Sequence, residues 1–199
     1  MGVSLPGGAE ARLRAGELAI LPTDTVYGIA CAAGQVAACA RLYRLKSRPV
    51  GQPTAVMLGS VAGLVEGLAG LPDRELRSLR LVLPGPVTLV VTNPARRFPH
   101  LCGDAPERIG VRVPRLEPAV TELADALGGL LITSANRRGG PVSARLADVP
   151  AELVSQCAVV VDGGRLPGTP SSVIDVTSQP AVLLRAGPDA DALMAVLSA

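Results

Sequence analysis

Residues 22–28 read Pro-Thr-Asp-Thr-Val-Tyr-Gly and follow directly on the apolar run Leu18–Leu21. A short apolar run that stops at a proline predicts a buried strand. Thr23, Asp24 and Thr25 would then lie at the end of a sheet, where ligands of α/β proteins commonly bind. The same residues also suit an ordinary turn in which Asp24 caps backbone donors, and the motif alone does not separate the two interpretations.

A pair of positive charges ends the next helix-like segment, Gln35–Lys46. Lys46 is the only lysine of the chain, and Arg48 follows it two residues later, just before Pro49. If the chain is extended here, both side chains point the same way and can hold phosphate oxygens, Arg48 as a planar fork and Lys46 as a point charge. The alternative is that both are cations favoured by the negative end of the helix dipole.

A third polar motif, Thr133-Ser134-Ala135-Asn136, follows the apolar strand predicted at Leu130–Thr133. Ser134 and Asn136 supply a hydroxyl and a carboxamide that can bind phosphate, ribose or a base edge, and nearby glycines allow close backbone approach. A simple strand-to-loop turn is the alternative. The pattern is not a P-loop, and no dinucleotide-binding glycine motif follows a strand elsewhere.

The remaining patterns alternate between strands and helices, with several short turns between neighbours. This predicts one α/β domain over residues 1–199, with a mixed sheet flanked by helices. The segment 93–107 is expected to be irregular. The expected strands are Leu18–Leu21, Val26–Ala32, Thr54–Leu58, Val87–Thr92, Ile109–Val113, Leu130–Thr133, Ala158–Asp162, Val173–Val176 and Val182–Arg185, and the expected helices are Ala9–Ala15, Gln35–Lys46, Ser60–Ala69, Pro72–Leu81, Glu117–Leu127, Val149–Ser155 and Asp189–Leu197.

Composition narrows the class of protein. The apolar fraction is 48%, enough for a core, but there is no Trp, one Phe and two Tyr, so the aromatic platforms of single-strand binders are not expected. The formal charge of +2 does not favour nucleic-acid binding over the whole surface. Four scattered cysteines and one histidine do not suit a zinc site. With no signal-peptide pattern and no long apolar run, we expect a soluble, cytoplasmic protein.

Taken in order, the motifs resemble those of the YrdC-like family, whose enzymes are threonylcarbamoyl-AMP synthases. The resemblance covers nearly the whole chain and is closest to the short, single-domain members. It departs from the family at Leu83, where many relatives have Trp, and at Met57, where some have His. The matching stretches are Pro22–Gly28, Lys46–Pro49, Pro84–Thr88, Gly110–Pro114, Ser134–Asn136, Asp162–Gly164, Ser171–Asp175 and Leu184–Gly187.

The resemblance implies a twisted mixed sheet around a concave basic cavity. It implies a reaction of L-threonine, bicarbonate and ATP, with Mg²⁺ accompanying the nucleotide and no protein metal site. The product, threonylcarbamoyl-AMP with pyrophosphate, would pass to a tRNA threonylcarbamoyl transferase complex, and a weak contact with tRNA stays open. By position, the resemblance implies that Lys46 and Arg48 are catalytic phosphate-binding residues, that Thr88, Ser134, Asn136 and Arg185 also bind ATP, and that Thr23, Thr25, Arg112 and Ser171 bind threonine.

Two other functions compete with this one. An RNA-binding module without turnover could use the same basic concave surface, and its binding would fall steeply with salt. A related module that forms carbamoyl-adenylate would use carbamoyl phosphate, but such modules normally lie in much larger chains with zinc-finger cysteines. Cations and hydroxyls without a Ser-His-Asp arrangement favour an attack on phosphorus that depends on positioning and charge neutralisation.

Overall fold

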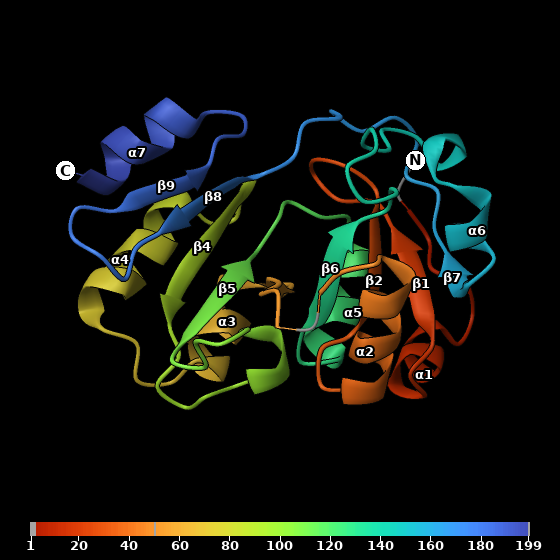
Figure 1. Ribbon diagram of the computed structural model, residues 1–199, viewed down its shortest axis with the longest axis horizontal. Helices are drawn as coiled ribbons and strands as arrows, with labels where there is room; N and C mark the ends of the chain where they lie inside the picture. Colours follow the sequence, from red (N-terminus) through yellow and green to blue (C-terminus); the bar gives the residue numbers. More distant parts are fainter. Residues whose placement is uncertain (1–2, 50, 199) are drawn as a thin grey trace.

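A single mixed sheet runs through the computed structural model, which describes residues 3–49 and 51–198 (Figure 1). Its strand order among the described residues is β7-β1-β2-β6-β3-β5-β4-β8-β9, with parallel pairs β1–β7, β3–β5 and β4–β8 and antiparallel pairs elsewhere. The predicted α/β domain with a mixed sheet is therefore confirmed. The strands are β1 Leu18–Leu21, β2 Gly28–Ala32, β3 Val56–Met57, β4 Val87–Thr92, β5 Arg108–Arg112, β6 Leu130–Ser134, β7 Cys157–Val160, β8 Ser172–Asp175 and β9 Val182–Arg185.

Seven α-helices lie among the described residues, each where the sequence predicts one. Ser60 is the N-cap of α3, as its position before the helical pattern indicates, and its Oγ accepts from Gly63 N at 3.0 Å. No described helix has the length and apolar content that a membrane crossing requires. The helices are α1 Ala9–Arg14, α2 Val36–Leu45, α3 Val61–Gly67, α4 Asp73–Val82, α5 Pro118–Ala126, α6 Ala151–Val154 and α7 Ala190–Ser198, with 3₁₀ turns at Pro99–Leu101 and Leu146–Asp148 that the sequence analysis does not predict.

The strands β1 and β2, and the first residues of β6, are buried on both faces. Along β1, Leu18 and Ile20 join the core cluster that contains the apolar residues of α2, whereas Ala19 and Leu21 join the cluster that contains those of α1 and α5. Alternate residues of a strand point to opposite faces, so a strand covered by helices on both faces must be apolar throughout. This explains the uninterrupted apolar run that precedes the first motif.

The strands β4, β5 and β8 are covered on one face only. Val87, Leu89 and Val91 of β4 belong to the core cluster that also holds Leu79 of α4. The residues between them, Thr88 and Val90, line a cavity on the opposite face. The same period of two places the alternate residues of β5 and β8 at this cavity. The uncovered face of this half of the sheet thus supplies side chains to a site.

Strand β3 connects the two halves of the sheet. It contains two residues, and Val56 pairs with Val111 of β5 on one side and with Leu131 of β6 on the other. In Figure 1, β4, β5, β8 and β9 form one group of strands, and β1, β2, β6 and β7 form the other. Because so short a strand pairs with each group over only two residues, the groups are free to diverge beyond it.

The hydroxyl of Tyr27 anchors the start of β2 to a distant loop. It lies 2.9 Å from Asp162 Oδ1 and 2.9 Å from Gly164 O, and it accepts from Gly163 N at 2.9 Å. Tyr27 is fully buried. The first polar motif is thereby tied to the segment that follows β7, which explains why an aromatic residue with a polar end stands within the motif.

We expect Tyr27→Phe to lower the free energy of unfolding by about 1–3 kcal/mol, because it leaves Gly163 N and an oxygen of the loop without their buried partner. Urea denaturation measures this. Tyr43→Phe is the comparison, since the Tyr43 hydroxyl bonds, within the described part of the chain, to Thr54 Oγ1 at 2.9 Å and to Gln52 O at 3.3 Å. A loss for Tyr27→Phe that is no larger than the loss for Tyr43→Phe would contradict the anchoring role.

Candidate functional site

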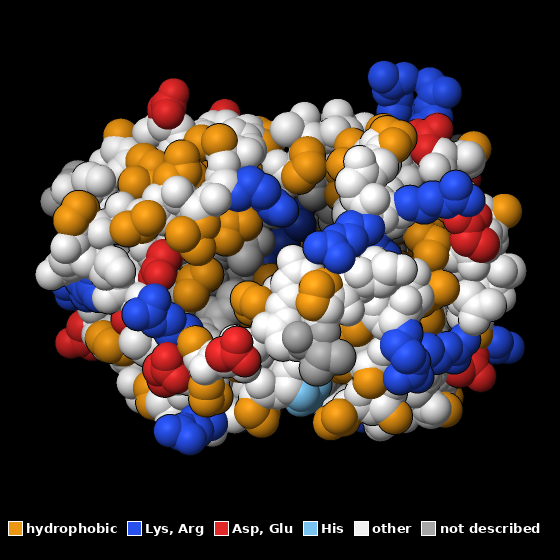
Figure 2. Space-filling view, viewed as in Figure 1, with side chains coloured by type: hydrophobic (Ala, Val, Ile, Leu, Met, Phe, Trp, Pro, Cys, Tyr) orange, Lys and Arg blue, Asp and Glu red, His pale blue; other side chains and the backbone are white. Residues whose placement is uncertain are grey.

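A cavity of about 630 Å³ lies between the two groups of strands. Its walls come from β4, β5 and β8 on one side and from β6 and the first polar motif on the other, and Pro53, Thr54 and Ala55 lead into β3 between them. Figure 2 shows the hollow on this face, with Lys and Arg side chains at its rim and in its depth. The volume suits a small organic ligand of nucleotide size.

The described lining of the cavity is strongly positive. It contains Arg48, Arg108, Arg112 and Arg185 and a single carboxylate, Asp175. That carboxylate is already occupied, because it accepts from Arg108 Nη1 at 3.2 Å and from Thr177 Oγ1 at 2.6 Å. The excess of fixed cations makes this a site for an anion.

The first motif forms a closed network around Arg112. Thr23 Oγ1 donates to Val26 O at 2.7 Å, and it lies 3.0 Å from Thr25 Oγ1. Arg112 Nη2 in turn donates to Thr25 Oγ1 at 2.8 Å and to Asp24 Oδ1, and the second oxygen of Asp24 accepts from Arg115 N at 3.1 Å. Thr25 lines the cavity, whereas Thr23 lies behind it and shapes the turn.

Arg112 carries a buried charge, and part of the hydrogen-bonding capacity of its guanidinium is not satisfied by the described residues. It is 8% exposed, and burial lowers its pKa, an effect that the nearby Asp24 opposes. Among the described residues, its Nε has no hydrogen-bond partner. A buried guanidinium without full pairing is costly. Asp24 reduces that cost and holds the group in place, and an anionic ligand would complete its bonding.

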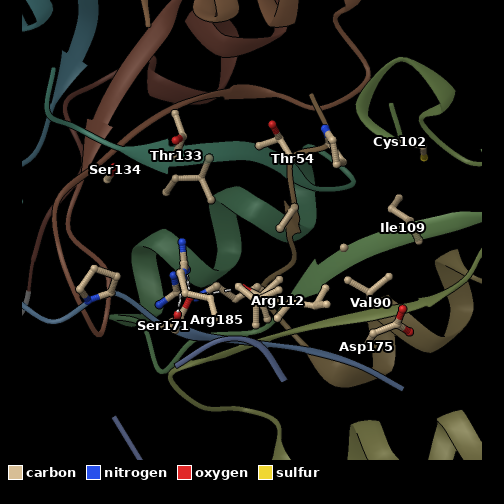
Figure 3. Close-up of a pocket in the computed structure, with 18 of the residues that line it drawn as sticks. Thr54, Val90, Cys102, Ile109, Arg112, Thr133, Ser134, Ser171, Asp175 and Arg185 are labelled. Carbon is tan, nitrogen blue, oxygen red and sulfur yellow. Dashed lines mark hydrogen bonds between the residues drawn. The ribbon is translucent and has the colours of Figure 1, made fainter. Parts of the chain in front are cut away.

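A second guanidinium approaches the same end of the cavity. In Figure 3, Arg112, Arg185 and Ser171 lie close together, away from Asp175 and Cys102. Arg185 Nη2 donates to Ser171 O at 2.8 Å, and the Ser171 hydroxyl lies 3.3 Å from Thr88 Oγ1. Burial and the charge of Arg112 both lower the pKa of Arg185. Two like charges held this close favour a carboxylate or phosphate between them.

Lys46 and Arg48 do not share a face, because the chain between them is not extended. Ser47 adopts a left-handed conformation with φ of 48°, which ends α2 by turning the chain. Lys46 Nζ therefore reaches across to β6, where it donates to Ser134 O at 2.8 Å and to the backbone and side-chain oxygens of Asn136. Lys46 supports the wall of the cavity from behind, whereas Arg48 lines it.

The two cations still influence each other. Burial, together with the charge of Arg48, lowers the pKa of Lys46 to about 8. Burial is also the main cause that lowers the pKa of Arg48. Arg48 Nη2 donates to Pro53 O at 3.0 Å, while its buried Nε has no partner among the described residues. An anion entering from the cavity would bind Arg48 directly and would favour the charged form of Lys46.

The third motif is held by its own side chains. Ser134 Oγ donates to Asn136 Oδ1 at 2.6 Å, and Asn136 Nδ2 donates to Gly140 O at 2.7 Å. Asn136 is 8% exposed and does not line the cavity, whereas Ser134 does. The carboxamide that the sequence analysis offered to a nucleotide is thus engaged within the loop. Its contacts shape the loop that presents Ser134.

The structure brings most of the expected residues together and adds others. Those that line the cavity are Thr25, Arg48, Thr88, Arg112, Ser134, Ser171 and Arg185, and those one hydrogen bond behind it are Thr23, Lys46 and Asn136. The sequence analysis missed Arg108, Asp175 and the anchoring role of Asp24. The alternation Arg108, Gly110, Arg112 along one strand is the signal that could have revealed the first of these.

Comparison with known proteins identifies the family of this chain. The model of the Sua5/YciO/YrdC family, described as telomere recombination, matches residues 11–187. This chain belongs to the Sua5/YciO/YrdC family. The human threonylcarbamoyl-AMP synthase is 38% identical over 160 residues, which are 79% of this chain and 55% of the human protein.

Two solved structures of the Sua5/YciO/YrdC family share the fold. Sua5 of P. abyssi in complex with L-threonine has a TM-score of 0.78 at 30% identity, covering 90% of this chain and 53% of Sua5. YciO of E. coli has a TM-score of 0.80 at 26% identity, covering 90% of this chain and 87% of YciO. The chain thus spans about half the length of the human enzyme and of Sua5, and most of the length of YciO.

The family resemblance implies Mg²⁺, but the described residues do not form a complete set of protein ligands for this ion. No cluster of three or more possible metal-ligating side chains occurs in residues 3–49 and 51–198. Asp175 is the single carboxylate of the described lining, and Arg108 and Thr177 already bind it. Mg²⁺ commonly keeps several waters and binds substrate phosphates, so the ion would enter with a nucleotide and would not need this chain's carboxylates.

Because Lys46 is the only lysine, its ionisation can be observed without interference from other lysines. Protein labelled with ¹³C-lysine should show one ε-carbon titration with a midpoint at a pKa of about 8, in contrast to about 10.4 for a free lysine. Arg48→Ala should raise the midpoint, because it removes a neighbouring positive charge, and added pyrophosphate should raise it too. A midpoint at the ordinary lysine value in the unliganded protein would contradict the buried position of Lys46.

Proposed function

We propose that this chain is an L-threonylcarbamoyladenylate synthase, which forms threonylcarbamoyl-AMP and pyrophosphate from L-threonine, bicarbonate and ATP. The observation that carries the proposal is the arginine-rich cavity between the two groups of strands, built from the motifs that the family shares. The human relative is named threonylcarbamoyl-AMP synthase, and the P. abyssi relative Sua5 has been solved in complex with L-threonine. In the cell, the product would supply the tRNA threonylcarbamoyl transferase complex.

The proposed reaction needs neutralisation of charge more than a side-chain nucleophile. The amine of threonine and bicarbonate combine to a carbamate with loss of water. A carbamate oxygen then attacks the α-phosphorus of ATP, a new P–O bond forms, and the bond to pyrophosphate breaks. Both partners in the second step are anions, so preorganised cations lower the barrier.

The arrangement of the cavity suggests a division of tasks. Arg112 and Arg185, beside Thr25 and Ser171, would bind the carboxylate and hydroxyl of threonine together with the developing carbamate. Arg48 and Ser134 would bind phosphate oxygens at the opposite wall, with Lys46 holding the 134–136 loop from behind. Mg²⁺ bound to the phosphates would neutralise part of their charge. Among the described residues, the buried Nε atoms of Arg48 and Arg112 have no hydrogen-bond partner, which supports this assignment because each can donate to an anionic ligand.

The decisive test is the dependence of pyrophosphate release on both co-substrates. We expect the purified protein to release pyrophosphate from ATP only when L-threonine and bicarbonate are present together. Arg48→Ala should reduce the rate by ~10²-fold, the usual cost of removing one preorganised charge-stabilising donor. Arg96→Ala, on the exposed loop after β4, is the control. Equal release without threonine would reject the proposal, and salt-sensitive RNA binding without any release would favour an RNA-binding module.

Asp24 should affect threonine more than ATP. Asp24→Asn keeps the shape of the side chain but removes the charge that holds Arg112, so we expect the KM for threonine to rise ~10-fold, equivalent to ~1.4 kcal/mol. The KM for ATP should change little. Steady-state kinetics with each substrate varied in turn measures this, and Asp104→Asn, at an exposed loop position, is the matched control. An equal rise in both constants would indicate a general loss of structure instead.

A further inference from the structure

Two thiols outside the cavity lie in contact. Cys31 is in β2 and Cys39 is in α2, and their Sγ atoms are 3.7 Å apart. Both are free thiols, with exposed fractions of 0% and 2%. Neither residue lines the cavity, so the proposed activity does not use them. A packing role would need only their apolar bulk and would not require sulfur facing sulfur.

The surroundings make the two thiols unequal. The hydrogen bond between them, together with the nearby His100, lowers the pKa of Cys39. The same bond and burial raise the pKa of Cys31. His100 Nε2 donates to Ala33 O at 2.9 Å, which fixes the ring beside the turn between β2 and α2, because a carbonyl can only accept. Cys39 is thus suited to attack as a thiolate, whereas Cys31 stays a thiol and is suited to react in the second step.

We propose that Cys31 and Cys39 are a modification site that hydrogen peroxide converts to a disulfide. The Cys39 thiolate attacks one peroxide oxygen, the O–O bond breaks, and the products are a sulfenic acid and hydroxide, which takes a proton to become water. The sulfur of Cys31 then attacks the sulfenic sulfur, the S–O bond breaks, and water leaves with the Cys31 proton. Two thiols are oxidised and one peroxide is reduced to two waters.

The bond would act on the cavity through α2. A disulfide has an S–S distance of ~2.05 Å, so the two sulfurs must approach by ~1.6 Å from their present separation. Side-chain rotation supplies part of this approach, and a movement of α2 relative to β2 supplies the rest. Strand β2 pairs with β6, where Gly28 is opposite Ser134, and Lys46 spans from the end of α2 to that same strand. The movement therefore strains the bonds of Lys46.

The chain offers a direct chemical test. The tryptic peptide Ala15–Arg41 contains both Cys31 and Cys39 and neither of the other two cysteines. After treatment with hydrogen peroxide and alkylation under denaturing conditions, we expect this peptide to carry no alkyl group and to be ~2 Da lighter than the reduced peptide, one disulfide having formed. Dithiothreitol should restore two alkylated thiols. Cys102→Ser and Cys157→Ser should not change the result, whereas Cys39→Ser should abolish it.

Other masses for this peptide would overturn the proposal: two alkylated thiols after oxidation, sulfinic or sulfonic acid, or a link to another cysteine. The wild-type masses decide this even if a serine variant fails to fold.

The coupling to α2 has its own test, which rests on the proposed function, whereas the peptide masses do not. Threonine-dependent pyrophosphate release should be at least threefold slower in the oxidised protein, recover with dithiothreitol, and stay unchanged on peroxide treatment of Cys31→Ser. Unchanged turnover in fully cross-linked protein would overturn the coupling. Absence of turnover in the reduced protein as well would count against the proposed function and leave the disulfide to be judged by mass.

Discussion

Strand β3 contributes only Val56 and Met57 to the sheet, yet these residues pair with β5 on one side and with β6 on the other. Longer pairing would hold the two groups of strands together along their whole length and would bury the faces that now line the cavity. With two residues, the sheet stays continuous while the groups diverge. Every wall of the site depends on this geometry, because Arg112 ends the strand beside β3 on one side and Ser134 ends the strand on the other.

The divergence of the two groups of strands leaves side chains in the cavity without packing partners, and the polar motifs hold these side chains in place. A cavity between two half-sheets exposes strand residues that would otherwise pack, and here those residues include arginines and hydroxyl-bearing side chains beside apolar ones such as Val90 and Ile132. Each cation has an internal partner that keeps it in place: Asp24 for Arg112, Ser171 for Arg185, and Pro53 O for Arg48. Held in this way, the charges need little rearrangement when an anion arrives, which is the basis of electrostatic preorganisation. Asp24, at the end of a buried strand, is as much a part of this arrangement as the arginine that it holds.

Local patterns explain which parts of the fold were predictable. The apolar run of β1 and the spacing of buried residues in α2 depend on burial periodicity, which is visible in a single sequence. The turn after α2 was not predictable, because Ser47 takes a left-handed conformation that non-glycine residues seldom adopt. That one residue separates the tasks of Lys46 and Arg48, placing Lys46 behind the wall and Arg48 in it. The side chain of Asn136 is engaged by its near neighbours Ser134 and Gly140 and also by Lys46, which lies 90 residues away in the chain.

The sequence by itself determined the class of fold, the order of its elements and which polar residues follow the ends of strands. These features depend on hydrophobic periodicity and on residue types that suit turns and anions. Only the tertiary structure decided which of those polar side chains reach the cavity and which hold their neighbours. The reason is that hydrogen-bonding capacity is finite: once Thr23, Lys46 and Asn136 have satisfied buried backbone and side-chain partners, little of each is left for a ligand. The partners of Thr23 and most of those of Asn136 are near in the sequence, but Lys46 reaches Ser134 and Asn136 only because folding brings the end of α2 beside β6.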